Sequence, residues 1–202
     1  VLRDNQEVAV RAESSAVVSI TGGMIRDHQR NALVGRRGST FALEDTTLMY
    51  NAIVTGTFNP ITPGDGAGYV LQDTTSPYDA DDVVRFHFRN VDIVSGTRLA
   101  RMDAESVSRL LNDPDTTFSQ MQEPYLDIIG GPIVTDTTWR RTDEVFIYRM
   151  LSRQGSSGAD FVEVAVGATL MIEPGVTLQF NATRGDPANY AGLTIWGSLV
   201  AN

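Results

Sequence analysis

Apolar residues in this chain occur in short alternating runs, separated by Gly, Pro, Asn and Asp. Residues 161–166, for example, place Val162, Val164 and Val166 on one face, and residues 176–180 alternate again. A period of two is the pattern of half-buried β-strands, whereas an amphipathic helix needs a period near 3.6. Short strands with this punctuation predict an all-β protein, which leaves a solenoid, a barrel or a sandwich open.

The spacing of the runs favours a solenoid. A step of 23 residues separates similar runs in two parts of the chain: 18–20 from 41–43, Ile25 from Leu48, and 170–172 from 193–195. A coil of a β-solenoid has about this length, and a coil buries its apolar face only by stacking on the next.

The middle of the chain differs. Residues 59–82 are rich in Pro, Gly and Asp and predict a long loop. Strands are expected at 83–88 and 91–94, and again at 125–129 and 144–148.

One helix is expected, at residues 103–111. Asp103 is the expected N-cap, Val107, Leu110 and Leu111 form an apolar stripe, and the sequence Asn-Asp-Pro at 112–114 stops the helix. These features predict three parts: residues 1–58 as the end of one solenoid portion, 59–144 as a loop-rich insertion or connector with the helix, and 145–202 as the start of a second portion.

Composition excludes several classes of function. The net charge is −9, with acidic residues scattered along the chain, so neither nucleic acid nor an anionic membrane surface is an expected partner. The chain has no cysteine, which excludes disulfides, thiolate zinc sites and a cysteine nucleophile. All 16 basic residues are arginine. No run approaches the ~18 apolar residues of a membrane span. Because the chain starts without Met and stops within an apparent strand, we expect it to be a fragment of a longer protein.

Two stretches resemble the opening coils of bacterial right-handed parallel β-helix repeat proteins: 162–180 (VEVAVGATLMIEPGVTLQF) and 192–201 (GLTIWGSLVA). Residues 15–55 resemble later coils more loosely. The resemblance implies sharp bends at Gly175 and Gly197, where glycine takes a positive φ without penalty. It also implies a large, modular, secreted or surface protein of the adhesin-like kind. The family includes polysaccharide lyases too, so the fold does not decide the activity.

Aspartates in two turns are the candidate metal ligands: Asp79, Asp81 and Asp82 in one, Asp113 and Asp115 in the other. Calcium takes six to eight oxygen ligands, and turn carboxylates can supply several. Neither run matches an EF-hand or a glycine-rich calcium repeat, so solvated turn residues are the competing interpretation. No other cofactor is expected.

Catalytic signals are weak. His28 and His87, the two histidines, lie far apart in sequence. Arginines and aspartates at 136, 140, 141 and 143 surround Trp139, a ring that could stack on a sugar in a lyase site or seal the core as a cap. Residues 184–186 spell Arg-Gly-Asp, and 181–183 form a glycosylation sequon.

The sequence therefore predicts right-handed parallel β-helix portions around an insertion with one short helix. The preferred function is a non-catalytic extracellular scaffold or adhesin component, whose partners are further coils of the same polypeptide or neighbouring copies. The alternative is a carbohydrate-active module, a lyase or a glycan-binding domain. A groove of stacked Asp, Arg and aromatic residues would favour this alternative, and faces lined by Thr, Ser and Asn would favour the scaffold.

Overall fold

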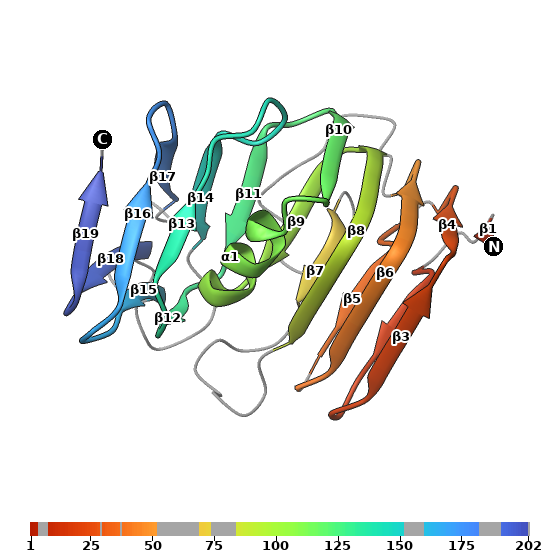
Figure 1. Ribbon diagram of the computed structural model, residues 1–202, viewed down its shortest axis with the longest axis horizontal. Coiled ribbons are helices and arrows are strands. Elements are labelled where there is room, and N and C mark those ends of the chain that lie inside the picture. Colours follow the sequence, from red (N-terminus) through yellow and green to blue (C-terminus); the bar gives the residue numbers. More distant parts are fainter. Residues whose placement is uncertain are drawn as a thin grey trace.

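The computed structural model describes residues 1–3, 8–28, 30–36, 38–51, 69–73, 84–151, 160–181 and 191–201. The described chain is mostly β-strand with one short helix, and every strand pairing in it is parallel (Figure 1). This confirms the all-β prediction. The strands form four sheets, which we name A to D.

Sheets A and B are the larger two. Sheet A has the order β1 (Leu2–Arg3), β4 (Met24–Arg26), β6 (Thr40–Met49), β8 (Arg85–Gly96) and β10 (Thr117–Met121), and β3 (Val17–Thr21) also pairs with β6. Sheet B has the order β17 (Thr177–Asn181), β14 (Ile147–Leu151), β11 (Tyr125–Ile128), β9 (Arg98–Met102), β7 (Tyr69–Asp73), β5 (Leu33–Gly35) and β2 (Val10–Ala12).

Sheets C and D contain three strands each. Sheet C consists of β12 (Gly131–Ile133), β15 (Asp160–Val164) and β18 (Ala191–Ile195), and sheet D of β13 (Thr137–Trp139), β16 (Thr169–Ile172) and β19 (Ser198–Ala201). A parallel neighbour cannot be reached through a hairpin, so the chain leaves each sheet and returns to it. In the N-terminal part the chain alternates between sheets A and B, and from β11 onward it repeats the order B, C, D. We call each return to sheet B one winding.

The predicted 23-residue step is right in the N-terminal part. Val18 pairs with Phe41, and Ile25 pairs with Leu48. It is wrong in the C-terminal part, where Leu170 pairs with Leu199 rather than Leu193. The partner of Leu193 is Val162, 31 residues earlier. The apolar alternation is shared by β15, β16 and β18, so the pattern alone did not reveal which strands are neighbours.

The described strands in the middle of the chain continue the sheets. Strand β7 lies inside the predicted loop 59–82 and pairs with β5 and β9. The two strands expected at 83–88 and 91–94 form the single strand β8. Sheet B runs through both expected boundaries, at residues 58 and 144, because β5 pairs with β7 and β11 pairs with β14. The described part of 59–144 is therefore not an excursion from the stack.

The helix prediction is confirmed. Helix α1 spans Ala104–Asn112, and the Asp103 side chain accepts hydrogen bonds from the backbone N–H groups of Glu105 and Ser106. Val107 and Leu110 are fully buried. The helix packs against β8, β12 and β13, and so lies between sheet A and the first strands of sheets C and D (Figure 1).

Bends with left-handed backbone recur at matching places in successive windings of sheet A. Such positive φ values are uncommon outside glycine. They form two columns, which we call the bend columns: Gly22, Asp45 and Asn90 in the first, and Asp27, Tyr50, Ser95 and Gln120 in the second. Each column follows the strand register, since Thr21, Glu44 and Arg89 are paired, as are Met49 and Val94.

Two predictions about single positions need correction. Gly175 has a positive φ of 81°, as expected, but Gly197 does not. A Cβ at Gly197 would lie 2.2 Å from the Ala168 carbonyl oxygen, so glycine is needed there for close backbone approach. Val166 is 84% exposed, because β15 ends at Val164 and the chain then turns.

Candidate functional site

A buried polar network of charged side chains lies on sheet B. At its centre is Asp127 in β11, whose side chain is fully buried. Arg149, the neighbour of Asp127 in β14, donates from Nε and Nη2 to the two carboxylate oxygens, each at 2.6 Å. This two-point geometry is the strong form of an arginine–carboxylate pair. The Tyr69 hydroxyl donates to the same carboxylate from β7.

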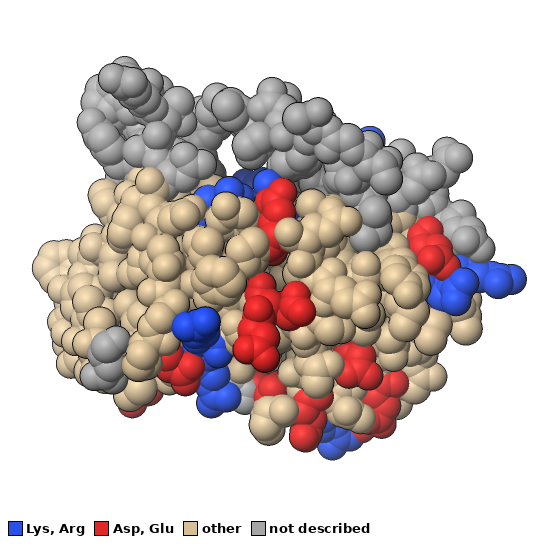
Figure 2. All heavy atoms as spheres, turned by 90° about the horizontal axis from the view of Figure 1, so that it is seen from above, with Lys and Arg blue, Asp and Glu red and all other residues tan. Residues whose placement is uncertain are grey.

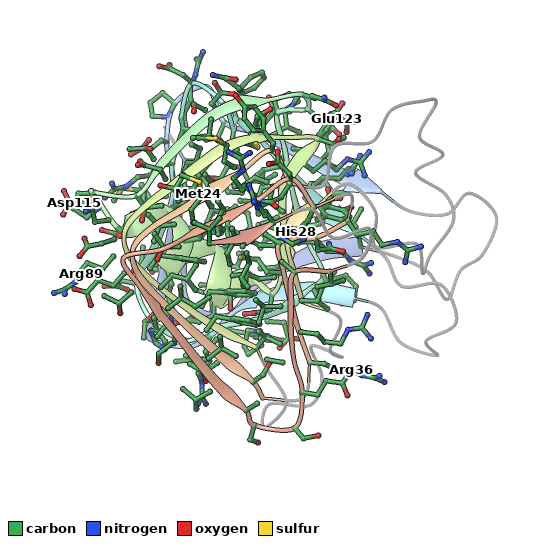
Figure 3. All side chains as sticks on the ribbon, turned by 90° about the vertical axis from the view of Figure 1, so that its right-hand side faces the viewer. Met24, His28, Arg36, Arg89, Asp115 and Glu123 are labelled. Carbon is green, nitrogen blue, oxygen red and sulfur yellow. The ribbon has the colours of Figure 1, made fainter. Side chains whose placement is uncertain are left out.

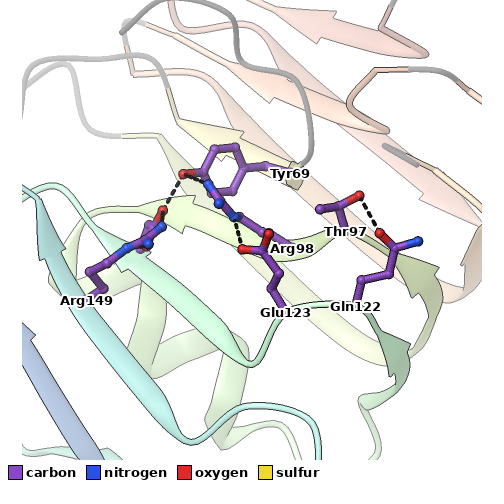
Figure 4. Close-up of polar contacts among 7 residues, drawn as sticks. Tyr69, Thr97, Arg98, Gln122, Glu123 and Arg149 are labelled. Atoms are coloured by element: carbon purple, nitrogen blue, oxygen red, sulfur yellow. Dashed lines mark hydrogen bonds and ion pairs between the residues drawn. The ribbon is translucent and has the colours of Figure 1, made fainter. Parts of the chain in front are cut away.

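A second pair extends the network toward the start of β9 (Figure 4). Arg98 donates from Nε to Glu123 at 2.6 Å and from Nη1 to the Tyr69 hydroxyl at 3.3 Å. Beside it, the Thr97 hydroxyl donates to the Gln122 amide oxygen at 3.2 Å. The network thus joins side chains of three sheet-B strands, β7, β9 and β14, to Asp127 in β11.

Burial and charge keep the Tyr69 hydroxyl protonated. Burial raises the pKa of Tyr69 to about 12, and the Asp127 charge and hydrogen bond add to that rise. Burial by itself lowers the pKa of Arg149, but the hydrogen bonds and charge of Asp127 outweigh it, so the net direction is upward. The Arg149 guanidinium also lies 4.6 Å from the Tyr125 ring centroid, within cation–π range.

Chemically, this arrangement is suited to holding strands together. Both oxygens of Asp127 already accept hydrogen bonds, and Tyr69 is a donor whose raised pKa disfavours a role as a base near neutral pH. A lyase site needs a base that faces the substrate, and each of these groups faces another protein group. We call the group of Tyr69, Asp127 and Arg149, which joins three strands of sheet B, the clamp.

The calcium candidates do not come together in the described residues. Asp79, Asp81 and Asp82 lie outside the described residues. Asp113 is the C-cap of α1, and its carboxylate accepts from the Thr116 hydroxyl at 2.6 Å and from two backbone N–H groups. Asp115 is exposed. Within the described ranges no group of three His, Asp or Glu side chains is placed to hold a metal ion.

The two histidines differ in burial and lie in different parts of the fold. His28 is 3% exposed and lies in the body of the molecule, and both its ring nitrogens lack a hydrogen-bond partner (Figure 3). His87 is exposed on the outer face of sheet A. Among the described residues, no hydrogen bond or ion pair joins either ring to an acid, a base or a nucleophile.

Trp139 cannot stack on a sugar in this structure. Its side chain is fully buried and stacks on Tyr148, with ring centroids 5.1 Å apart. Tyr148 donates its hydroxyl to the Arg140 carbonyl at 2.5 Å, and Asp136 accepts from the Thr169 N–H at 2.8 Å. The cluster around Trp139 therefore seals and joins windings, which agrees with the core-sealing interpretation. Arg-Gly-Asp at 184–186 lies outside the described residues, as does most of the sequon.

Sequence reasoning missed Tyr69, Arg98, Asp127 and Arg149. A usable signal was present for two of them. Asp127 and Arg149 are charged residues inside otherwise apolar strands, 22 positions apart, which is close to the N-terminal step. Tyr69 gave no signal, because it lies in the range that was expected to be a loop.

On the face shown in Figure 2, acidic side chains gather near the middle and along the lower edge, and basic side chains lie on either side of them. The described residues contain no helix that is long and apolar enough to cross a membrane.

Comparison with known proteins gave one partial similarity. No family model matches the chain, and no solved structure matches it. Over 61 residues, 30% of this chain, it is 38% identical to Protein bark beetle of Drosophila melanogaster. The matched stretch is 2% of that protein's length, so the chain spans a very small part of that relative.

Proposed function

We propose that this chain forms part of a right-handed parallel β-helix of the kind found in bacterial repeat proteins, and that it serves as a non-catalytic extracellular scaffold. The observation that carries the proposal is the clamp across the windings: Tyr69, Asp127 and Arg149 satisfy one another and come from three strands of one parallel sheet. Side chains that bond to one another in this way stiffen the stacked strands. They also leave no acid–base pair among themselves that is free to react with a substrate. A secreted or cell-surface location goes with this role.

Stacked bends support the same proposal. The bend columns repeat the same backbone shape in each winding, as expected for a chain that follows one helical path. Side-chain carboxylates add links between windings: Glu144 accepts from the N–H groups of Gln120 and Met121, and Glu173 accepts from the N–H of Arg141. Such an arrangement favours a stiff rod over a pocket.

Exposed apolar side chains support the proposed partners. Phe180, Trp196, Leu199 and Val200 are between 38% and 67% exposed, and all belong to the last winding of sheets B, C and D or to the turn within it. Apolar faces and open strand edges need a neighbour. Further windings of the same polypeptide, or a neighbouring copy, would supply it.

The alternative proposal is a carbohydrate-active module, and one observation favours it. Aromatic rings, arginines and aspartate are stacked along one sheet, in Tyr69, Arg98, Tyr125, Asp127 and Arg149, which is the composition of a glycan groove. Against it, Asp127 is fully buried, and neither oxygen is left for a sugar. A structural calcium ion remains a proposal for the aspartates at 79, 81 and 82.

The deciding experiment is a depolymerase assay of the full-length parent protein on a panel of acidic polysaccharides, with and without calcium. The absorbance of unsaturated uronate products is followed. The scaffold proposal expects no product from any substrate. Product that forms with the natural protein and disappears in Asp127→Asn and Arg149→Gln variants that still fold would establish the alternative.

A further inference from the structure

A cluster of basic side chains lies on the outer face of sheet A, away from the clamp. In the first half of β8, Arg85, His87 and Arg89 are exposed, while Phe86 between them is fully buried. Alternate residues of a strand share a face and lie about 7 Å apart. Strand β10 pairs only with the second half of β8. Helix α1 packs against β8, and its Ser106 hydroxyl donates to the carbonyl of Val84, the residue before the strand, at 3.0 Å. The helix also carries the exposed Arg109, whose charge acts on His87.

Neighbouring carboxylates neutralise this cluster only in part. Arg89 pairs with Glu44, the residue opposite it in β6. Glu105 lies 3.6 Å from Arg109, but its two carboxylate oxygens also accept from the Thr135 hydroxyl and the Val134 N–H. The Arg85 guanidinium has no ion pair with any described residue.

The pKa of His87 reflects the excess of positive charge around it. Partial burial lowers its pKa, and the charges of Arg109 and Arg85 lower it further. Its partner across the strand pair is Ala42, which carries no charge. Within a chain of net charge −9, this is a local surplus of cationic groups that no described acid fully offsets.

We propose that Arg85, His87 and Arg109 form a binding site for a doubly charged tetrahedral oxyanion, of the sulfate or phosphate class. Arginine presents a fork of N–H donors that matches two oxygens of such an anion. The imidazole adds a donor, and when protonated it adds a charge. An anion seated there relieves the repulsion among the three groups. The inference is independent of the proposed scaffold function.

The test is an NMR titration of His87 with inorganic sulfate, with inorganic phosphate, and with sodium chloride at matched ionic strength. Binding and protonation are linked, so an anion that prefers the protonated imidazole must raise the pKa of His87. At a free sulfate concentration about ten times its dissociation constant, the titration midpoint should rise by about one pH unit relative to chloride. A His87→Asn variant identifies the signal. Comparison of the sulfate and phosphate arms shows which anion the site prefers.

Two variants separate a site from general screening. Arg85→Gln and Arg109→Gln should each raise the His87 midpoint in chloride, because a like charge is removed, and each should weaken the response to sulfate. Arg11→Gln makes the same change in net charge on β2 of sheet B and should leave the response intact. Equal midpoints in sulfate and chloride would overturn the proposal. So would a sulfate response that survives unchanged in the Arg85→Gln/Arg109→Gln double variant.

Discussion

Asp45 and Asn90 occupy the same position in two paired strands, and both have left-handed backbone, with φ of 49° and 52°. The Asn90 amide donates from Nδ2 to the Asp45 carboxylate at 2.7 Å, so the side chains link the bends that their own backbones form. Asn and Asp tolerate this conformation better than other residues with a Cβ. The pair therefore fixes both the shape of each bend and the contact between windings.

Asn90→Gly and Asn90→Val should differ clearly in stability. Glycine adopts the left-handed conformation freely and loses only an exposed hydrogen bond, so we expect a change within about 0.5 kcal/mol. Valine is β-branched and should lower the free energy of unfolding by about 1 to 3 kcal/mol. Urea titrations measure both. Equal stabilities would mean that the bend does not constrain the residue type.

Gly197→Ala should be strongly destabilising. The added Cβ would meet two backbone carbonyl oxygens, of Ala168 and Ala165, at 2.2 and 2.3 Å, and backbone cannot move aside cheaply. We expect a loss of at least about 2 kcal/mol. Gly23→Ala is the matched control, because the nearest contact of its added Cβ would be an ordinary van der Waals distance of 3.4 Å, to Ile20 Cγ2. A mild effect at Gly197 would contradict the close approach of the two turns.

Arg149→Met tests the clamp. The change leaves the fully buried carboxylate of Asp127 without its cation, which should cost about 3 to 5 kcal/mol of unfolding free energy. The double variant Asp127→Leu/Arg149→Met removes both charges and should recover most of the loss. Arg89→Met breaks an exposed pair with Glu44 and should cost less than about 1 kcal/mol. The same urea measurements decide, and a small effect of Arg149→Met would show that the clamp contributes little.

Alkaline pH should weaken the fold partly through Tyr69. Its pKa is raised from 10.0 to about 12, so the unfolded chain releases this proton at a lower pH than the folded chain. The contribution is fully present below pH 10 and is lost as the pH rises toward 12. Tyr69→Phe should remove about 2 to 3 kcal/mol of that loss. The pKa of Tyr148 is also raised, so some alkaline loss should remain in the variant. The check is the free energy of unfolding of both proteins, measured across this pH range. An identical pH dependence of that free energy in the two proteins would contradict the prediction.

Glu144→Ala should expose one edge of sheet A. The Glu144 carboxylate accepts from the N–H groups of Gln120 at 3.0 Å and Met121 at 2.9 Å, at the edge strand β10. We expect faster hydrogen exchange at these two amides and a loss of about 1 to 2 kcal/mol. Glu163→Ala, at an exposed strand position, serves as control. Unchanged exchange at residues 120 and 121 would show that the carboxylate does not protect them.

The sequence was informative where the spacing was regular. Val18 pairs with Phe41 as the 23-residue step predicted, and the capped helix after Asp103 could be placed because its start, stripe and stop are all local signals. The step failed for Leu170, whose alternating neighbourhood fits β18 as well as β19. Alternation tells which face is buried, but it does not tell which strand lies next to which.

The contact between Tyr69 and Asp127 was beyond sequence reasoning for a different reason. Tyr69 and Asp127 are 58 residues apart, and their contact depends on how many residues the chain spends between strands. That number varies: Leu33 pairs with Leu71, whereas Leu71 pairs with Ala100. No local pattern encodes the number of residues between distant strands. A charged residue inside a strand therefore indicates a polar contact, but it does not identify a partner several windings away.

The bend columns stay aligned although the spacing of their members changes, from Gly22 to Asp45 to Asn90. The first of these intervals is 23 residues and the second is 45. The position of the bends in the strand register is therefore kept although the interval between them nearly doubles. Such a chain can gain or lose sequence in its connections without any change in strand pairing. Strand pairing is thus conserved from one winding to the next even where the sequence interval is not, so the pairing and not the chain length defines the architecture.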